Sequence, residues 1–182
     1  QTNMLRDGHL ATFTGVSGPV IYRGDAYPKD ALGDAFVPEP SGNMIRRQKI
    51  SFKDGSVTGE NAYEKSEWLT STDERFRPVN LYNTPEGDLM IVDMYRGILQ
   101  HRVYVTSFLR KQILERGLDK PVGLGRIYRV THQSKRTRAR PGFAKKSGEQ
   151  LAAMLENPGG WQRDTAQRLL IDAADKSIAP AL

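Results

Sequence analysis

The sequence has no cysteine, only three histidines and no long apolar run. Without cysteine the chain can hold no disulfide, no thiolate-ligated metal and no covalently attached c-type haem. Its longest apolar stretches, such as residues 89–92, are a few residues long, whereas a helix needs roughly 20 apolar residues to cross a membrane. The sequence therefore predicts no membrane span in this chain and leaves the redox compartment open.

A secretory signal is also missing, because the first ten residues already carry Arg6, Asp7 and His9 and no apolar segment follows them. The chain opens on Gln1 within a strand-like pattern, which predicts an internal or C-terminal piece of a longer protein. The missing signal therefore says nothing about export.

The 182 residues are 38% hydrophobic and 26% charged, with 17 glycines and 10 prolines, a composition typical of a turn-rich globular protein. The net charge of +6 equals the number of basic residues between His132 and Lys146, where no acid is present. Because this run also contains Pro141 and Gly142, we interpret residues 132–146 as a solvated basic linker. Contact with an anionic partner such as nucleic acid is the alternative, and no nucleic-acid partner is expected.

Two segments repeat in the first part of the chain. Residues 33–39 (G-D-A-F-V-P-E) align without gaps on residues 87–93 (G-D-L-M-I-V-D), and each ends on a carboxylate, Glu39 or Asp93. Residues 42–46 align on residues 125–129, with Gly first and Arg fifth. A repeat of roughly 40 to 50 residues built from short strands is typical of propeller blades. We therefore predict a mainly β fold with the last blades of a β-propeller in residues 1–131.

Two helical parts interrupt or follow this framework. Thr106 is placed to cap a helix near residues 105–117, and Gly117 to end it in the left-handed conformation. In residues 147–182, Ser147 and Gln150 form a capping-box pattern, and two short amphipathic helices are joined by a Pro-Gly turn. This pattern predicts the start of a HEAT-like α-solenoid.

Residues 71–101 carry the densest group of polar side chains. One interpretation is a buried ion-pair network that ties neighbouring blades together, since buried charges must be paired. Asp73, Asp93 and Glu39 are assigned to that network. No metal site is predicted, because the chain has no Asp-rich loop and its histidines are scattered.

Several motifs carry a resemblance to a known family: Y-R-G-D at 22–25, E-P-S-G-N-M-I-R-R at 39–47, S-T-D-E-R-F-R-P-V-N at 71–80, D-M-Y-R-G-I-L-Q-H at 93–101, G-R-I-Y-R-V at 125–130 and W-Q-R-D-T-A-Q-R-L-L at 161–170. Together they resemble the membrane-bound dehydrogenases of planctomycetes and verrucomicrobia. Those proteins are similar to glucose/sorbosone dehydrogenases in their propeller, which is followed by HEAT-like repeats and often by a c-type cytochrome domain.

The resemblance implies a sugar or alcohol dehydrogenase of the periplasm or cell envelope that passes electrons to a c-type cytochrome partner. It also implies pyrroloquinoline quinone with calcium as cofactor. Arg75, Arg77 and Arg96 would then hold cofactor carboxylates, and Tyr95 would stack on the planar ring system. His101 would act as the catalytic base, since an ordinary histidine pKa near 6.5 suits that role.

The alternative function is a non-catalytic propeller and HEAT scaffold that docks the rest of the propeller or other subunits of a larger complex. The solenoid pattern and the lack of a compact catalytic motif favour it. A third hypothesis, nucleic-acid binding through Lys135 to Lys146, predicts steeply salt-dependent binding.

Overall fold

The computed structural model describes residues 5–6, 9–10, 12–133 and 142–181. About 29% of the chain is helical and 25% is strand, in antiparallel sheets with a few helices. The predicted order, a β framework followed by a helical C-terminal part, is confirmed. Helix and strand contents are nevertheless similar, and the described residues do not show a complete propeller or solenoid.

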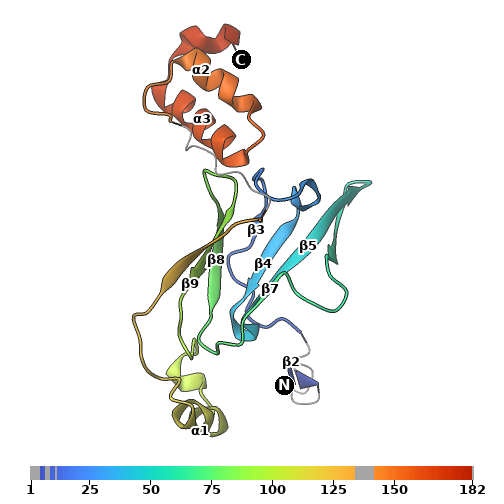
Figure 1. Cartoon of the computed structure of the whole chain (residues 1–182), viewed down its shortest axis with the longest axis vertical. Helices are drawn as coiled ribbons and strands as arrows, with labels where there is room; N and C mark the ends of the chain where they lie inside the picture. Colours follow the sequence, from blue (N-terminus) through green and yellow to red (C-terminus); the bar gives the residue numbers. More distant parts are fainter. Residues whose placement is uncertain (1–4, 7–8, 11, 134–141, 182) are drawn as a thin grey trace. The chain divides into compact units, whose positions relative to one another are not determined.

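The strands form three sheets (Figure 1). A small sheet pairs β1 (Leu5–Arg6) with β2 (His9–Leu10). A five-stranded sheet runs β3 (Val20–Ile21), β4 (Ala35–Glu39), β5 (Met44–Lys53) and β6 (Ser56–Asn61), with β7 (Leu69–Thr70) also paired to β5. A three-stranded sheet has the order β10 (Arg126–Val130), β9 (Leu89–Asp93), β8 (Pro78–Asn83).

The α-helices are α1 (Ser107–Glu115), α2 (Gly148–Ala153) and α3 (Gly160–Ala173). Five 3-10 turns accompany them: η1 (Lys29–Ala31), η2 (Pro40–Gly42), η3 (Arg102–Tyr104), η4 (Met154–Glu156) and η5 (Lys176–Ala181). No described helix combines the length and apolar composition that crossing a bilayer requires. Residues 134–141 of the predicted basic linker lie outside the described residues.

The chain divides into two compact units. Unit 1 comprises Gln1–Ile21, Asp34–Leu81 and Ile91–Tyr128, and unit 2 comprises Tyr22–Gly33, Tyr82–Met90 and Arg129–Leu182. Strands β8, β9 and β10 each contribute residues to both units.

The core of unit 1 lies on the five-stranded sheet. Phe36 of β4 and Ile45 of β5 are fully buried, and the ring of Trp68 meets Phe36 edge to face at 4.8 Å. Leu69 of β7 lies opposite Ile45 in the antiparallel register. The segment at residues 68–70 therefore covers the apolar face at the start of β5.

In unit 2 the helical part has its own small core. Leu151, Ala166 and Leu170 are buried together, with Phe143 and Ile178 packed against them. The predicted capping box is confirmed, because the Ser147 and Gln150 side chains each accept from the other residue's backbone amide. Local sequence rules thus place the start of α2 correctly.

Two backbone segments of unit 2 contact the start of α3. The Gly160 amide donates to the Arg23 carbonyl at 2.6 Å, and the Arg23 guanidinium forms a two-armed ion pair with Asp164. The side-chain amide of Gln162 donates to the carbonyl of Pro85 in the β8–β9 turn. These contacts hold the helical part against the loop at residues 22–33 and the turn at residues 84–88.

The sequence repeat corresponds to a repeat in structure. Gly33 and Gly87 have φ values of +88° and +85°, and β4 and β9 each begin two residues later and end on the carboxylate. The aspartate after each glycine forms an ion pair with an arginine Nε: Asp34 with Arg47 at 2.6 Å and Asp88 with Arg129 at 2.7 Å.

The alignment of the second strand in the repeat needs a shift of one residue. The sequence alignment matched Arg46 to Arg129, whereas the ion pairs make Arg47 the counterpart of Arg129. This shift also aligns the first residues of β5 and β10, Met44 and Arg126. Neighbouring arginines at 46 and 47 made the two alignments indistinguishable without the partner carboxylates.

Candidate functional site

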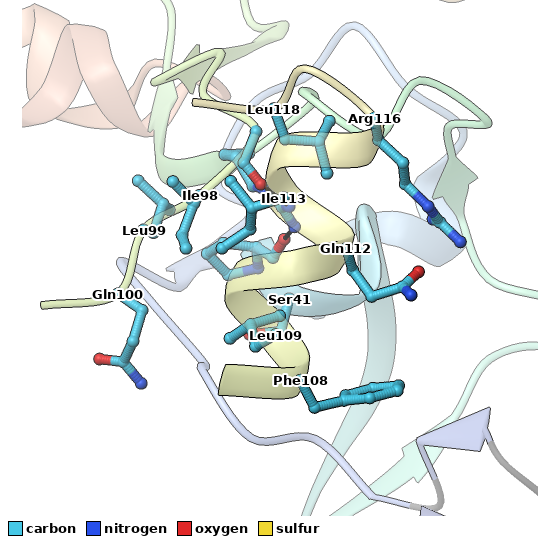
Figure 2. A pocket seen from close by; sticks show the side chains of 13 residues that line it. Ser41, Ile98, Leu99, Gln100, Phe108, Leu109, Gln112, Ile113, Arg116 and Leu118 are labelled. Carbon is cyan, nitrogen blue, oxygen red and sulfur yellow. Dashed lines mark hydrogen bonds between the residues drawn. The ribbon is translucent and has the colours of Figure 1, made fainter. Parts of the chain in front are cut away.

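The segment at residues 71–101 ends at an open cavity of about 660 Å³ in unit 1 (Figure 2). Its walls are η2, the loop at residues 97–100 and α1. Most of its lining is apolar, and the six aliphatic and aromatic side chains that line it are called the α1 surface below: Ile98, Leu99, Phe108, Leu109, Ile113 and Leu118. Figure 2 shows Ile98 on the loop facing Ile113 on the helix, while Phe108 and Arg116 extend away from them.

Arg77 lines this cavity and is held by the backbone around it. Its three guanidinium nitrogens donate to the carbonyl oxygens of Pro40, Arg96 and Gly97, at 2.6, 2.9 and 2.8 Å. Burial lowers the pKa of Arg77, and the nearby carboxylates of Glu74 and Asp93 oppose that shift. Arg77 therefore fixes the turn that forms one wall of the cavity.

Helix α1 forms the other wall. The Thr106 hydroxyl accepts from the Leu109 amide at 3.2 Å and Gly117 has φ +60°, so both predicted ends of the helix are confirmed. Ile113 is buried, whereas 73% of Phe108 and 39% of Leu109 are exposed. The helix thus presents apolar side chains to solvent as well as to the cavity.

Asp73 and Tyr95 lie together, and Arg126 covers the Tyr95 ring. The Tyr95 hydroxyl donates to Asp73 at 2.8 Å, and the Arg126 guanidinium lies 3.5 Å from the centre of the Tyr95 ring, a cation–π contact. The pKa of Asp73 is lowered, chiefly because its carboxylate accepts from the Arg75 amide and further because of the Tyr95 hydroxyl. The same hydrogen bond from Tyr95 to Asp73 raises the pKa of Tyr95.

Glu39 and Asp93 are both buried and both hold backbone amides. Glu39 accepts from the amides of Thr14, Gly15 and Ser41. Asp93 accepts from the amides of Arg77 and Tyr95 through one oxygen, Oδ1. In the network predicted around them, the carboxylates thus accept hydrogen bonds from backbone amides, and the arginines donate to backbone carbonyls.

Arg75 and Arg96 differ in their surroundings. The Arg75 guanidinium donates to the carbonyls of Gly117 and Lys120, at 2.8 and 3.1 Å, and so ties the chain after α1 to the loop at residue 75. Arg96 is exposed, and its carbonyl, not its side chain, holds Arg77.

His101, the predicted base, lies at the start of η3. It is exposed, its Nδ1 accepts from the Val103 amide at 3.4 Å, and its ring meets the Tyr104 ring at 6.0 Å. These are the contacts of a residue that caps a turn. His101 does not line the cavity beside Arg77.

The side chains expected to hold a quinone cofactor do not form a site that fits it. Arg75 and Arg77 donate to carbonyl oxygens, and Arg126 covers the ring of Tyr95. In the part of the chain that the structure describes, no group of three His, Cys, Asp or Glu side chains could hold a metal ion.

The apolar α1 surface is the feature that the sequence interpretation missed. The sequence predicted the helix and its ends, but not that Phe108, Leu109 and Leu114 are exposed. Together with Ile113, these residues lie on more than one face of the helix. This spacing of apolar residues is the feature of the sequence that indicates an exposed apolar surface.

The fold and the cavity thus define a protein of β-sheets and a few helices, with an apolar surface beside α1 and a small helical C-terminal part. The model of one family, described as a domain of unknown function (DUF7133), matches residues 1–134, and the chain belongs to that family. Neither a curated protein nor a solved structure matches the chain.

Proposed function

We propose that this chain is a protein-interaction module that docks a partner protein on the α1 surface. The observation that carries the proposal is the open apolar cavity beside α1, with Phe108 and Leu109 exposed at its edge. Apolar side chains gathered around a hollow are typical of interaction sites, whereas isolated exposed ones are common on any protein surface.

The charge at the cavity indicates which partner fits. The charged side chains that line it are Arg77 and Arg116, and both are basic. A partner segment with an apolar side chain flanked by carboxylates would complement them. Arg116 already pairs with Glu74 at the rim, so the apolar contact supplies most of the affinity and the charges supply orientation.

The contacts of the predicted catalytic residues support the same proposal. Arg75, Arg77 and Tyr95 stabilise loops and turns, and His101 caps a turn. A scaffold uses its polar residues in this way, while its binding energy comes from exposed apolar side chains.

Site-specific photo-crosslinking tests this proposal. A photoreactive phenylalanine analogue in place of Phe108 should label a discrete partner, and Leu109→Glu should abolish that labelling because it places a charge in the apolar contact. The same analogue at Lys111, an exposed position on the same helix, is the matched control. Equal labelling from both positions, or labelling that Leu109→Glu leaves unchanged, contradicts docking at α1.

A second candidate is the propeller dehydrogenase that the sequence motifs suggest, with electrons passing to a c-type cytochrome in the periplasm. The repeated Gly-Asp-strand-carboxylate unit, with equivalent Asp–Arg pairs in two antiparallel sheets, supports blade-like modules. In that proposal the quinone and calcium bind to residues other than Arg75, Arg77 and Tyr95. The longer protein, loaded with pyrroloquinoline quinone and calcium, should then reduce an artificial acceptor with a sugar or alcohol, and no reduction across a broad substrate panel counts against it.

A further inference from the structure

Strand β10 is the last strand of its sheet. It pairs with β9 on one side, and no strand among the described residues pairs with its other edge. Its counterpart in the repeat, β5, is paired on both sides, with β4 on one edge and with β7 at Met44 and Ile45 on the other. The five-stranded sheet therefore has a strand, β7, at the position where the three-stranded sheet has none.

Burial shows the consequence of this difference. Ile45, the second residue of β5, is fully buried, whereas 67% of Ile127, the second residue of β10, is exposed. Ile45 has Leu69 opposite it in the antiparallel register, and Trp68 packs beside it on Phe36. Ile127 has the same place in its strand without that cover.

The surroundings of Ile127 have the polar groups that an incoming strand could use. A cavity of about 550 Å³ lies beside it and is lined by the basic residues Arg96 and Arg126. Asp93 also lines this cavity, is 1% exposed, and its Oδ2 accepts no hydrogen bond within the described part of the chain. The site therefore offers an apolar side chain, two cations and a carboxylate oxygen that needs a donor.

The segment that covers β5 indicates what would cover β10. It reads Glu67-Trp68-Leu69-Thr70, and the Glu67 carboxylate forms a two-armed contact with Arg46 of β5. An acidic residue, an aromatic residue, an aliphatic residue and a β-branched residue follow one another. In the equivalent register on β10, the aliphatic residue would lie opposite Ile127 and the β-branched residue opposite Arg126.

We propose that the free edge of β10 binds an extended segment of a partner protein as an additional antiparallel strand. Backbone hydrogen bonds to the strand edge would supply affinity, and pockets for alternate side chains would supply specificity. The segment has the acidic–aromatic–aliphatic pattern of residues 67–70 and covers Ile127. This second interface is distinct from the α1 surface and does not depend on it.

A synthetic peptide with the sequence of residues 65–72 (K-S-E-W-L-T-S-T) is the probe, titrated into the whole 182-residue chain. We expect saturable binding, followed by fluorescence anisotropy, and amide NMR shifts at Arg126, Ile127 and Tyr128. Ile127→Asp should weaken binding by about tenfold or more, whereas Ile127→Val should bind like the wild type. Because Ile127 is exposed, both variants should keep the circular dichroism spectrum of the wild type.

Two controls test the apolar contact and the independence of this interface from the α1 surface. A peptide with serine in place of the tryptophan and leucine should not bind, because it lacks the apolar pair. Leu109→Glu on the α1 surface should leave peptide binding unchanged, so the docking proposal and this one can fail separately.

Four results would overturn the proposal. They are no saturation at millimolar peptide, binding that Ile127→Asp leaves unchanged, NMR shifts confined to Met44 and Ile45, and an Ile127-dependent dimer without peptide. The third would mean that the peptide replaces β7 on β5. The fourth would mean that a second copy of the chain covers the edge.

Discussion

Arg77 shows how one side chain can meet the chemical requirements of two different roles. An arginine in a polar loop has the planar set of donors that a cofactor carboxylate needs. Here the same donors bind three backbone carbonyls from η2 and the loop at residues 96–97. The partners of an arginine depend on which backbone segments the fold brings to it, so its residue type alone did not decide its role.

Asp73 and Tyr95 give a prediction about pH. The pKa of Asp73 is depressed in the folded chain, so its contribution to stability is present above its unfolded pKa, roughly 4, and is lost as pH falls through the lower folded value. The pKa of Tyr95 is raised, so its contribution is present below roughly pH 10 and is lost as pH rises through the higher folded value.

We expect Tyr95→Phe to raise the pKa of Asp73 only part of the way to its usual value, because the Arg75 amide still donates to the carboxylate. NMR titration of the Asp73 carboxyl carbon measures this shift. Phenylalanine has no hydroxyl to ionise, so the variant should also lose the fall in the free energy of unfolding that Tyr95 ionisation causes at alkaline pH. An unchanged Asp73 pKa in Tyr95→Phe contradicts the hydrogen bond as a cause.

At the scale of elements, the repeat at β4 and β9 depends on a glycine in a conformation that other residues rarely adopt. Gly33 and Gly87 share nearly the same positive φ, but their surroundings differ. A Cβ at Gly33 would meet nothing within 4 Å, whereas a Cβ at Gly87 would lie 2.4 Å from Asp25 Oδ1 and 3.0 Å from the Asp25 amide nitrogen.

This pair separates backbone strain from crowding. Gly33→Ala should lower the free energy of unfolding by about 1–2 kcal/mol, the usual cost of a left-handed conformation for an L-residue. Gly87→Ala should cost clearly more, because the contact with the Asp25 backbone must also shift. Urea unfolding of the two variants measures the difference, and equal losses would contradict the crowding at Gly87.

The elements that the sequence predicted well are the ones set by neighbouring residues. The caps at Thr106 and Ser147 and the strands after Gly33 and Gly87 depend on side chains a few positions away. The roles of the arginines could not be predicted in the same way. Arg77 reaches a carbonyl 37 residues away and Arg75 one that is 42 residues away, and such partners follow only from the fold.

The sequence drew attention to the polar residues at 71–101, but not to the apolar surface beside them. The polar segment at residues 71–101 does border a cavity, through Arg77 and residues 97–100. The cavity wall opposite is α1, which carries the exposed apolar side chains of Phe108 and Leu109. Periodicity gives a helix and its faces, but it does not show which face remains uncovered.

At the scale of the whole molecule, each unit contains one copy of the buried Asp–Arg pair and one tryptophan. Unit 1 has Asp34 with Arg47 and contains Trp68, and unit 2 has Asp88 with Arg129 and contains Trp161. The Arg47 side chain is 10% exposed, and that of Arg129 is 40% exposed and also lies 3.8 Å from Glu86. Removing the paired aspartate therefore leaves a more deeply buried arginine charge in unit 1 than in unit 2.

We expect Asp34→Asn to lower the free energy of unfolding by about 3 kcal/mol, because it leaves a buried arginine unpaired. Asp88→Asn should lower it by less, because Arg129 remains exposed to water and close to Glu86. Variants with a single tryptophan, Trp161→Phe or Trp68→Phe, let fluorescence follow each unit separately. Strands β8, β9 and β10 contribute residues to both units, so both tryptophans should report one denaturant transition that each substitution shifts as a whole. Two separate transitions, with each substitution moving only the one in its own unit, would show that the units unfold independently.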